Sequence, residues 1–130
     1  MKHLSIILLS IFLASCSKSL KVEFVNKSGI SLSICSIQDS GSGTQCEQVN
    51  NNSQIKLAWR TGDFQITSKG KVFNYKAEVP RPFEKYHESD NPITVIVNSA
   101  MSLLVVPIGQ AVNTVTINNQ PNGWPIEPSA

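Results

Sequence analysis

Residues 20–34 read LKVEFVNKSGISLSI, and this stretch decides the fold class. Apolar and polar side chains alternate on both sides of a turn signal, Asn26-Lys27-Ser28-Gly29. Strict alternation over several residues is typical of a β-strand with one buried face. We therefore expect two strands here, joined as a hairpin.

Further segments that read as strands follow along the chain, between short polar breaks. Residues 55–59, 64–66 and 73–79 alternate again, residues 93–97 and 103–106 are runs rich in β-branched side chains, and residues 112–117 close the series. None shows a 3.6-residue period. About eight short strands with frequent turns are typical of a β-sandwich or a small barrel. The sequence predicts an all-β chain: a single small antiparallel β-sandwich, Ig-like or transthyretin-like, over residues 20–118.

Two proline-rich segments interrupt the strand pattern. The first, residues 80–92, carries Phe83, Tyr86 and His87 and reads as a long loop, because proline cannot donate to a sheet ladder. The second is an extended tail, residues 119–130, which carries Trp124. These four aromatic side chains are the candidate partner surface. We expect Trp124 and Ile126 to pack back and seal an open sheet edge; the alternative is that the tail is a docking peptide.

The N-terminal residues predict export and lipid attachment. An apolar run, residues 4–14, follows Lys2 and leads into Leu13-Ala14-Ser15-Cys16. The run is shorter than the about 20 residues that a spanning helix needs, and it fits a secretory signal. The last four residues fit a bacterial lipobox, so we expect a signal peptide over residues 1–15 and a lipid, palmitate included, on Cys16. The alternative is an ordinary secreted protein with a chance cysteine.

The residues after Cys16 bear on the membrane and on the reach of the domain. Ser17 in place of Asp favours the outer membrane over the inner one, whereas the pair Lys18-Ser19 resembles a retention signal of some other Gram-negative groups. We expect the periplasmic face of the outer membrane. Residues 17–19 span roughly 10 Å at most, so the domain would sit close to the bilayer.

Two further cysteines, Cys35 and Cys46, follow the lipobox. Export would place them in an oxidising compartment, where a pair is expected to form a disulfide. The bridge would close a short polar loop and stabilise the fold by roughly 2–3 kcal/mol. No C-x-x-C spacing and no neighbouring histidine favour metal or redox chemistry instead.

Composition argues against several functional classes. The chain has 130 residues and a net charge of +2, and it carries no basic patch, so we expect no nucleic-acid partner. Beyond the signal peptide His87 is the one histidine, and a serine triad would have to combine it with neighbours such as Ser89 and Asp90. No nucleophile elbow, phosphate loop, zinc spacing or EF-hand is present. We therefore expect no enzyme, no metal and no cofactor; a pocket that unites His87 with carboxylates would revive an enzymatic hypothesis.

The tail motif carries a resemblance to a family. Residues 120–128 read QPNGWPIEP, after a strand pair that ends LLVVP at residues 103–107. The order of features resembles small, functionally uncharacterised lipoproteins of proteobacteria with a C-terminal Gln-Pro-x-Gly-aromatic-Pro-x-x-Pro motif. The resemblance covers most of the chain beyond the signal peptide and implies an architecture without an activity.

These observations lead to a functional hypothesis. We expect a lipid-anchored envelope domain that acts as a non-enzymatic interaction or structural module and binds a protein near the membrane. The alternative is a protective lipoprotein that excludes phages or plasmids or inhibits a cell-wall hydrolase.

Overall fold

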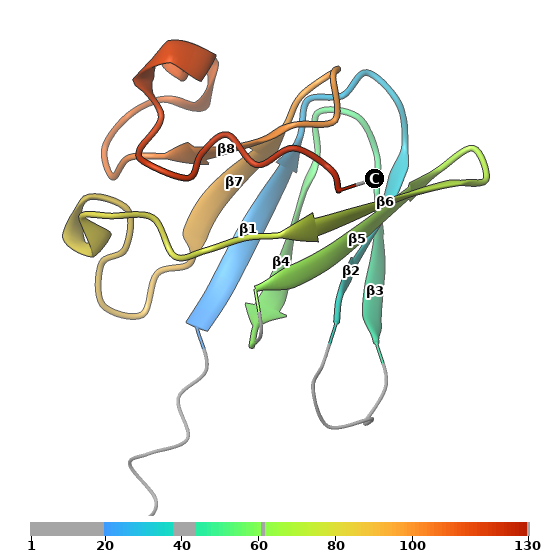
Figure 1. Ribbon diagram of the computed structural model, residues 1–130, viewed down its shortest axis with the longest axis horizontal. Coiled ribbons are helices and arrows are strands. Elements are labelled where there is room, and N and C mark those ends of the chain that lie inside the picture. Colours follow the sequence, from blue (N-terminus) through green and yellow to red (C-terminus); the bar gives the residue numbers. More distant parts are fainter. Residues whose placement is uncertain (1–19, 38–43, 61, 130) are drawn as a thin grey trace, which may run out of the picture.

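Two four-stranded sheets pack face to face in the computed structural model, which describes residues 20–37, 44–60 and 62–129 (Figure 1). The first sheet has the order β4-β1-β7-β8: β4 Gln54–Trp59, β1 Leu20–Asn26, β7 Ile93–Val97 and β8 Leu103–Val106. The second has the order β3-β2-β5-β6: β3 Gln45–Val49, β2 Leu32–Ser36, β5 Asp63–Ser68 and β6 Lys71–Lys76. The described residues thus hold eight strands, and the all-β sandwich is confirmed.

The alternation in the sequence sets which side chains enter the core. In β1, Val22 and Phe24 are fully buried between the sheets, while Lys21 and Glu23 point outward. The Phe24 ring meets the Phe64 ring from β5 edge to face, with centroids 4.9 Å apart. Such pairs add about 0.5–1.5 kcal/mol beyond area burial. The two sheets therefore bind each other through the apolar faces that the period-two pattern marks.

The first two strands do not form the expected hairpin. β1 pairs with β4 and, in parallel, with β7, whereas β2 pairs with β3 and β5. The chain crosses between sheets at Asn26, whose side chain is fully buried. Its amide donates to the carbonyls of Ile30 (2.7 Å) and Val49 (3.0 Å), and its oxygen accepts from Ser28. The hairpin prediction was wrong because alternation marks a buried face but not the strand that lies beside it.

The strand order bears on the two expected topologies. In an immunoglobulin constant-type sandwich, the first and second strands share a sheet. Here β1 and β2 lie in different sheets, and the β1–β7 pair is parallel within otherwise antiparallel sheets. This order differs from the immunoglobulin constant-type arrangement.

Two segments differ from their predicted structure. β3 was not expected, because four of its five residues are exposed and polar or disulfide-bonded, as befits an edge strand. Residues 112–117 were expected as a strand but contain the 3-10 helix η2, Val112–Thr114, and lead into η3, Ile117–Asn119. Val112 and Val115 pack on a second apolar cluster, formed on the outer face of the first sheet by Val25, Ile96, Leu104 and Val106. Val112 and Val115 are three residues apart, so in a turn both side chains can pack on this cluster. Alternating side chains of a strand would reach it in the same way.

Residues 120–129, which we call the strap, cross from β8 to the edge of β6 (Figure 1). Ile126 exchanges two backbone hydrogen bonds with Leu103, both 2.9 Å. The Gln120 side chain does the same with Val105, accepting from its N–H (2.7 Å) and donating to its carbonyl (3.0 Å). Ser129 donates its N–H to the Asn74 carbonyl of β6 at 2.8 Å. The expectation that the tail seals an open edge is confirmed.

Gly62, in the turn between β4 and β5, is under a steric constraint. Its φ is +81°, and a Cβ there would collide with the Ala77 carbonyl oxygen. The Gly62 carbonyl also accepts a 2.7 Å hydrogen bond from the Ala77 N–H. Gly70, in the turn between β5 and β6, has a φ of +78° but open space around the Cβ position. The two glycines thus share a backbone conformation and differ in crowding.

We predict that Gly62→Ala destabilises the domain more than Gly70→Ala does. Both variants bear the about 1–2 kcal/mol cost of a left-handed non-glycine residue. Gly62→Ala adds overpacking, which typically costs about 1–3 kcal/mol. Denaturant unfolding of both variants measures the difference. Equal midpoints would show that the close approach to Ala77 is relieved at no cost.

Candidate functional site

The loop over residues 80–92 is held by one buried ring and a few backbone hydrogen bonds. Tyr86 lies in the main core and is 7% exposed. The N–H of His87 donates to the Phe83 carbonyl at 3.0 Å, and the N–H of Ile108 donates to the Lys85 carbonyl at 2.8 Å. The second bond ties the loop to the segment that follows β8. The side chains between these attachments therefore have defined positions.

Phe83 and His87 form an aromatic pair on this loop. Phe83 begins the 3-10 helix η1, Phe83–Lys85, and its side chain is 39% exposed. The His87 ring stacks on it, with centroids 4.8 Å apart and planes 21° apart. A rigid, part-exposed aromatic pair offers contact area at little entropic cost, which is typical of residues that dominate binding interfaces.

A cleft of about 730 Å³ lies beside this pair, between the loop and the segment after β8. A smaller hollow of about 270 Å³ adjoins it and shares Tyr86 and Glu88 as lining residues. Ile108 lines both and is 46% exposed. Sequence reasoning missed Ile108, because residues 107–110 carry no signal beyond a turn. The cleft is large enough to accept side chains of a partner.

The cleft unites His87 with two carboxylates, Glu84 and Glu88. That juxtaposition is the condition set above for an enzymatic hypothesis. General acid–base catalysis further needs a carboxylate or nucleophile within hydrogen-bond reach of the imidazole. The contact that orients His87 is its stack on Phe83. Among the described residues, no group of three or more His, Cys, Asp or Glu side chains could hold a metal ion.

Two residues of the candidate partner surface are buried. Tyr86 and Trp124 are each 7% exposed and belong to the main core. The Trp124 indole N–H donates to the Glu78 carbonyl at 3.1 Å. Both rings were assigned to a surface because aromatic residues in proline-rich loops serve anchoring and docking equally well. Phe83 and His87 remain at the surface, joined by Ile108.

The strap also encloses a buried tyrosine. The Tyr75 hydroxyl donates to the Met101 carbonyl at 2.6 Å. Burial raises the pKa of Tyr75 well above its usual range, and the negative charge of Glu127 raises it further. The Ser102 hydroxyl donates a hydrogen bond to the carboxylate of Glu127, and its Oγ lies 2.8 and 2.7 Å from the two carboxylate oxygens. The hydroxyl of Tyr75 is therefore a neutral, structural donor.

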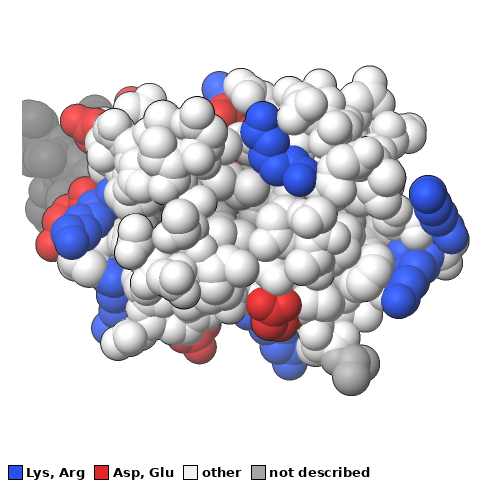
Figure 2. All heavy atoms as spheres, turned by 90° about the horizontal axis from the view of Figure 1, so that it is seen from above, with Lys and Arg blue, Asp and Glu red and all other residues white. Residues whose placement is uncertain are grey.

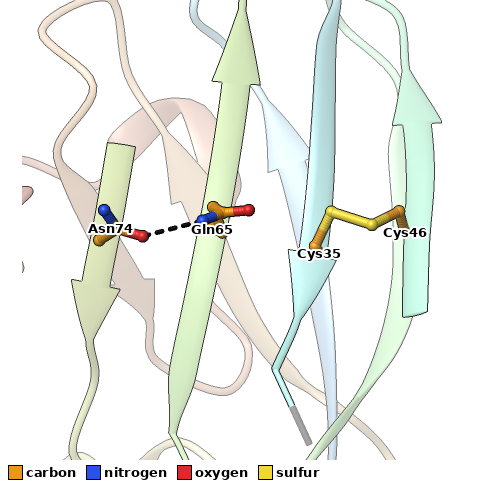
Figure 3. The surroundings of a disulfide bond; sticks show 4 residues. All are labelled: Cys35, Cys46, Gln65 and Asn74. Atoms are coloured by element: carbon orange, nitrogen blue, oxygen red, sulfur yellow. Dashed lines mark hydrogen bonds between the residues drawn. A yellow bond between two sulfur atoms is a disulfide. The ribbon is translucent and has the colours of Figure 1, made fainter. Parts of the chain in front are cut away.

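The predicted disulfide is confirmed. Cys35 of β2 and Cys46 of β3 face each other in register, with Cα atoms 4.0 Å apart. Figure 3 shows the bond in one row with Gln65 and Asn74, whose amides join at 3.0 Å. The row crosses the outer face of the second sheet. The disulfide thus ties the edge strand β3, which contributes little to the core, to its neighbour.

The predicted signal peptide, lipidated Cys16 and tether, residues 1–19, lie outside the described residues. In the part of the chain that the structure describes, no helix is long and apolar enough to cross a membrane. The face seen in Figure 2 is mostly uncharged, with acidic and basic side chains at several places around it.

Comparisons of the chain with protein-family models, with curated proteins and with solved structures found no match.

We predict that Trp124→Ala lowers the stability of the domain by about 3–5 kcal/mol, the usual cost of truncating a buried aromatic side chain. The matched control is Ile117→Ala, because Ile117 is 56% exposed and exposed substitutions usually stay within about 0.5 kcal/mol. Thermal unfolding followed by circular dichroism compares the two. A Trp124→Ala melting temperature equal to that of the control would contradict the anchoring role.

Proposed function

We propose that this chain is a lipid-anchored β-sandwich of the cell envelope that binds an envelope protein and performs no catalysis. The observation that carries the proposal is the rigid Phe83–His87 pair beside the cleft, with Ile108 exposed on the wall. An exposed aromatic pair next to a depression is the arrangement in which interface hot spots are found.

The anchor is supported by sequence and by one structural fact. Cys16 ends the lipobox, and β1 begins at Leu20. Four residue steps span at most about 14 Å, so a lipid on Cys16 would hold the start of β1 near the headgroups. The Cys35–Cys46 disulfide agrees with an oxidising compartment. We place the domain on the periplasmic face, with the outer membrane favoured by Ser17.

A protective lipoprotein, which excludes phages or plasmids or inhibits a wall hydrolase, is the second candidate. The observation in its favour is the disulfide, which ties β2 to β3 one residue from the end of β2 and one from the start of β3. A disulfide that joins two neighbouring strands close to their connection suits an inhibitor of a hydrolase, because it fixes the two strand ends relative to each other. The connecting residues 38–43 lie outside the described residues.

We predict that Cys16→Ser abolishes palmitate incorporation and leaves the precursor unprocessed. The thiol of Cys16 is the lipid acceptor in this proposal, and its hydroxyl analogue cannot replace it. Metabolic labelling with radioactive palmitate, followed by gel electrophoresis, measures the outcome. Cys46→Ser is the matched control and should keep the label. Labelled Cys16→Ser protein would refute the lipid anchor.

We also predict that a photo-crosslinking residue at Phe83 or Ile108 captures one discrete envelope protein in living cells. The same residue at Val72, which is 50% exposed at the start of β6, is the matched control. Mass spectrometry identifies the crosslinked species. Capture of the same protein from Val72, or of none from Phe83 and Ile108, would show that the cleft is not the partner face.

A further inference from the structure

The strap occupies a site that the rest of the domain builds without it. Its hydrogen bonds to β8 use the N–H and carbonyl groups of Leu103 and Val105. Those two residues are already positioned on their other side, since Leu103 pairs with Val97 and Val105 pairs with Val95 of β7. The edge of β8 is therefore a preformed row of donors and acceptors, as an edge strand is in any sheet.

Gln120 shows what this edge recognises. A carboxamide carries a donor and an acceptor in the same relation as a peptide group. Gln120 uses both toward the backbone of Val105, at 3.0 and 2.7 Å. Two residues away along β8, the backbone of Ile126 makes the equivalent pair with Leu103. The strap is thus bound as an added strand, with one side chain in place of a backbone group.

Two further contacts give the site selectivity. Trp124 packs in the main core and donates its indole N–H to the backbone carbonyl of Glu78, in the connection after β6. Glu127 accepts the hydroxyl of Ser102. Ser102 is held by the Asn98 side chain, whose oxygen accepts the Ser102 N–H at 2.9 Å. Both contacts are made to groups that the sheets and turns hold in place.

Few of the strap's hydrogen bonds lie within the strap itself. Its internal backbone hydrogen bond runs from Trp124 to the Pro121 carbonyl at 3.0 Å, and the other bonds described here go to the body of the domain. The segment therefore resembles an extended ligand that takes its conformation from its site. Strand addition of this kind is a general mode of peptide recognition, in which backbone bonds give affinity and side-chain pockets give specificity.

We propose that the groove along β8 is a strand-acceptor site for extended peptides of the pattern Gln-x-x-x-Trp-x-apolar-Glu, and that the strap of a second copy of this chain is its occupant in trans. Every copy carries both the groove and the matching segment, so reciprocal exchange gives a closed dimer with two-fold symmetry. Within one chain, linkage gives the strap an effective concentration in the millimolar range, so the monomer prevails until the strap is released.

The first test asks whether the groove binds the segment in trans. The probe is a fluorescein-labelled peptide with the sequence of residues 119–130, and the receptor is the chain from Ser17 onward with Trp124→Ala, which weakens its own strap. Fluorescence anisotropy should show saturable binding, at least about tenfold tighter than for a control peptide with Ala in place of Trp. The wild-type chain should bind the probe at least about tenfold more weakly, because its groove is filled.

Equal binding of the two peptides by the folded variant would overturn the proposal. If Trp124→Ala does not fold by circular dichroism, Ile126→Pro replaces it, because proline removes the N–H that Leu103 accepts while Trp124 is retained. Unfolding of both variants would also overturn the proposal, since an acceptor site must persist when its own strap leaves.

The second test concerns the second copy. The wild-type chain is concentrated, warmed to just below its melting temperature and cooled, and its mass is followed by sedimentation velocity. A dimer should appear in wild type and be absent from Trp124→Ala under the same treatment. A wild type that stays monomeric, or a dimer that persists in the variant, would exclude the second copy as occupant.

Discussion

The edge of β8 that faces away from β7 is the constraint on which this side of the sandwich depends. A sheet edge presents backbone donors and acceptors that must be satisfied by water, by another chain or by a cover. Here the strap provides the cover, through Gln120 and Ile126 on β8 and through Ser129 on β6. Trp124 then closes the core between the two sheets. The strap thereby links the two sheets, and it makes the edge of β8 less available for pairing with another protein chain.

The crossing between the two sheets depends on a buried polar residue. Asn26 is fully buried, yet its amide is satisfied by the carbonyls of Ile30 and Val49 and by Ser28. A buried amide without partners would cost about 1–3 kcal/mol, so the loops must keep this arrangement. Asn26 therefore stabilises the point at which the chain crosses from one sheet to the other.

The candidate site lies on loops that are attached to the two sheets by core packing and backbone hydrogen bonds. Tyr86 in the core and the Ile108–Lys85 backbone bond fix the segment over residues 80–92. Phe83 and His87 are then displayed as a stacked pair. Binding residues on loops supported by a rigid scaffold are common, because the scaffold bears the folding stability and leaves the loop free to specialise. The lipid anchor that we propose would add a second constraint, nearness to the bilayer.

The sequence by itself determined the fold class and the Cys35–Cys46 bond, and it left the packing of Trp124 open beside a docking alternative. The first two follow from local patterns: alternation marks a buried face, and two cysteines close in sequence are expected to pair. The tertiary structure alone decided the sheet that each strand joins, the edge strand β3 with its polar residues, and the turns over residues 112–117. It also buried Tyr86 and brought Ile108 beside His87. The physical reason is that a side-chain pattern records burial, whereas strand neighbours and cleft walls depend on contacts between residues far apart in the chain.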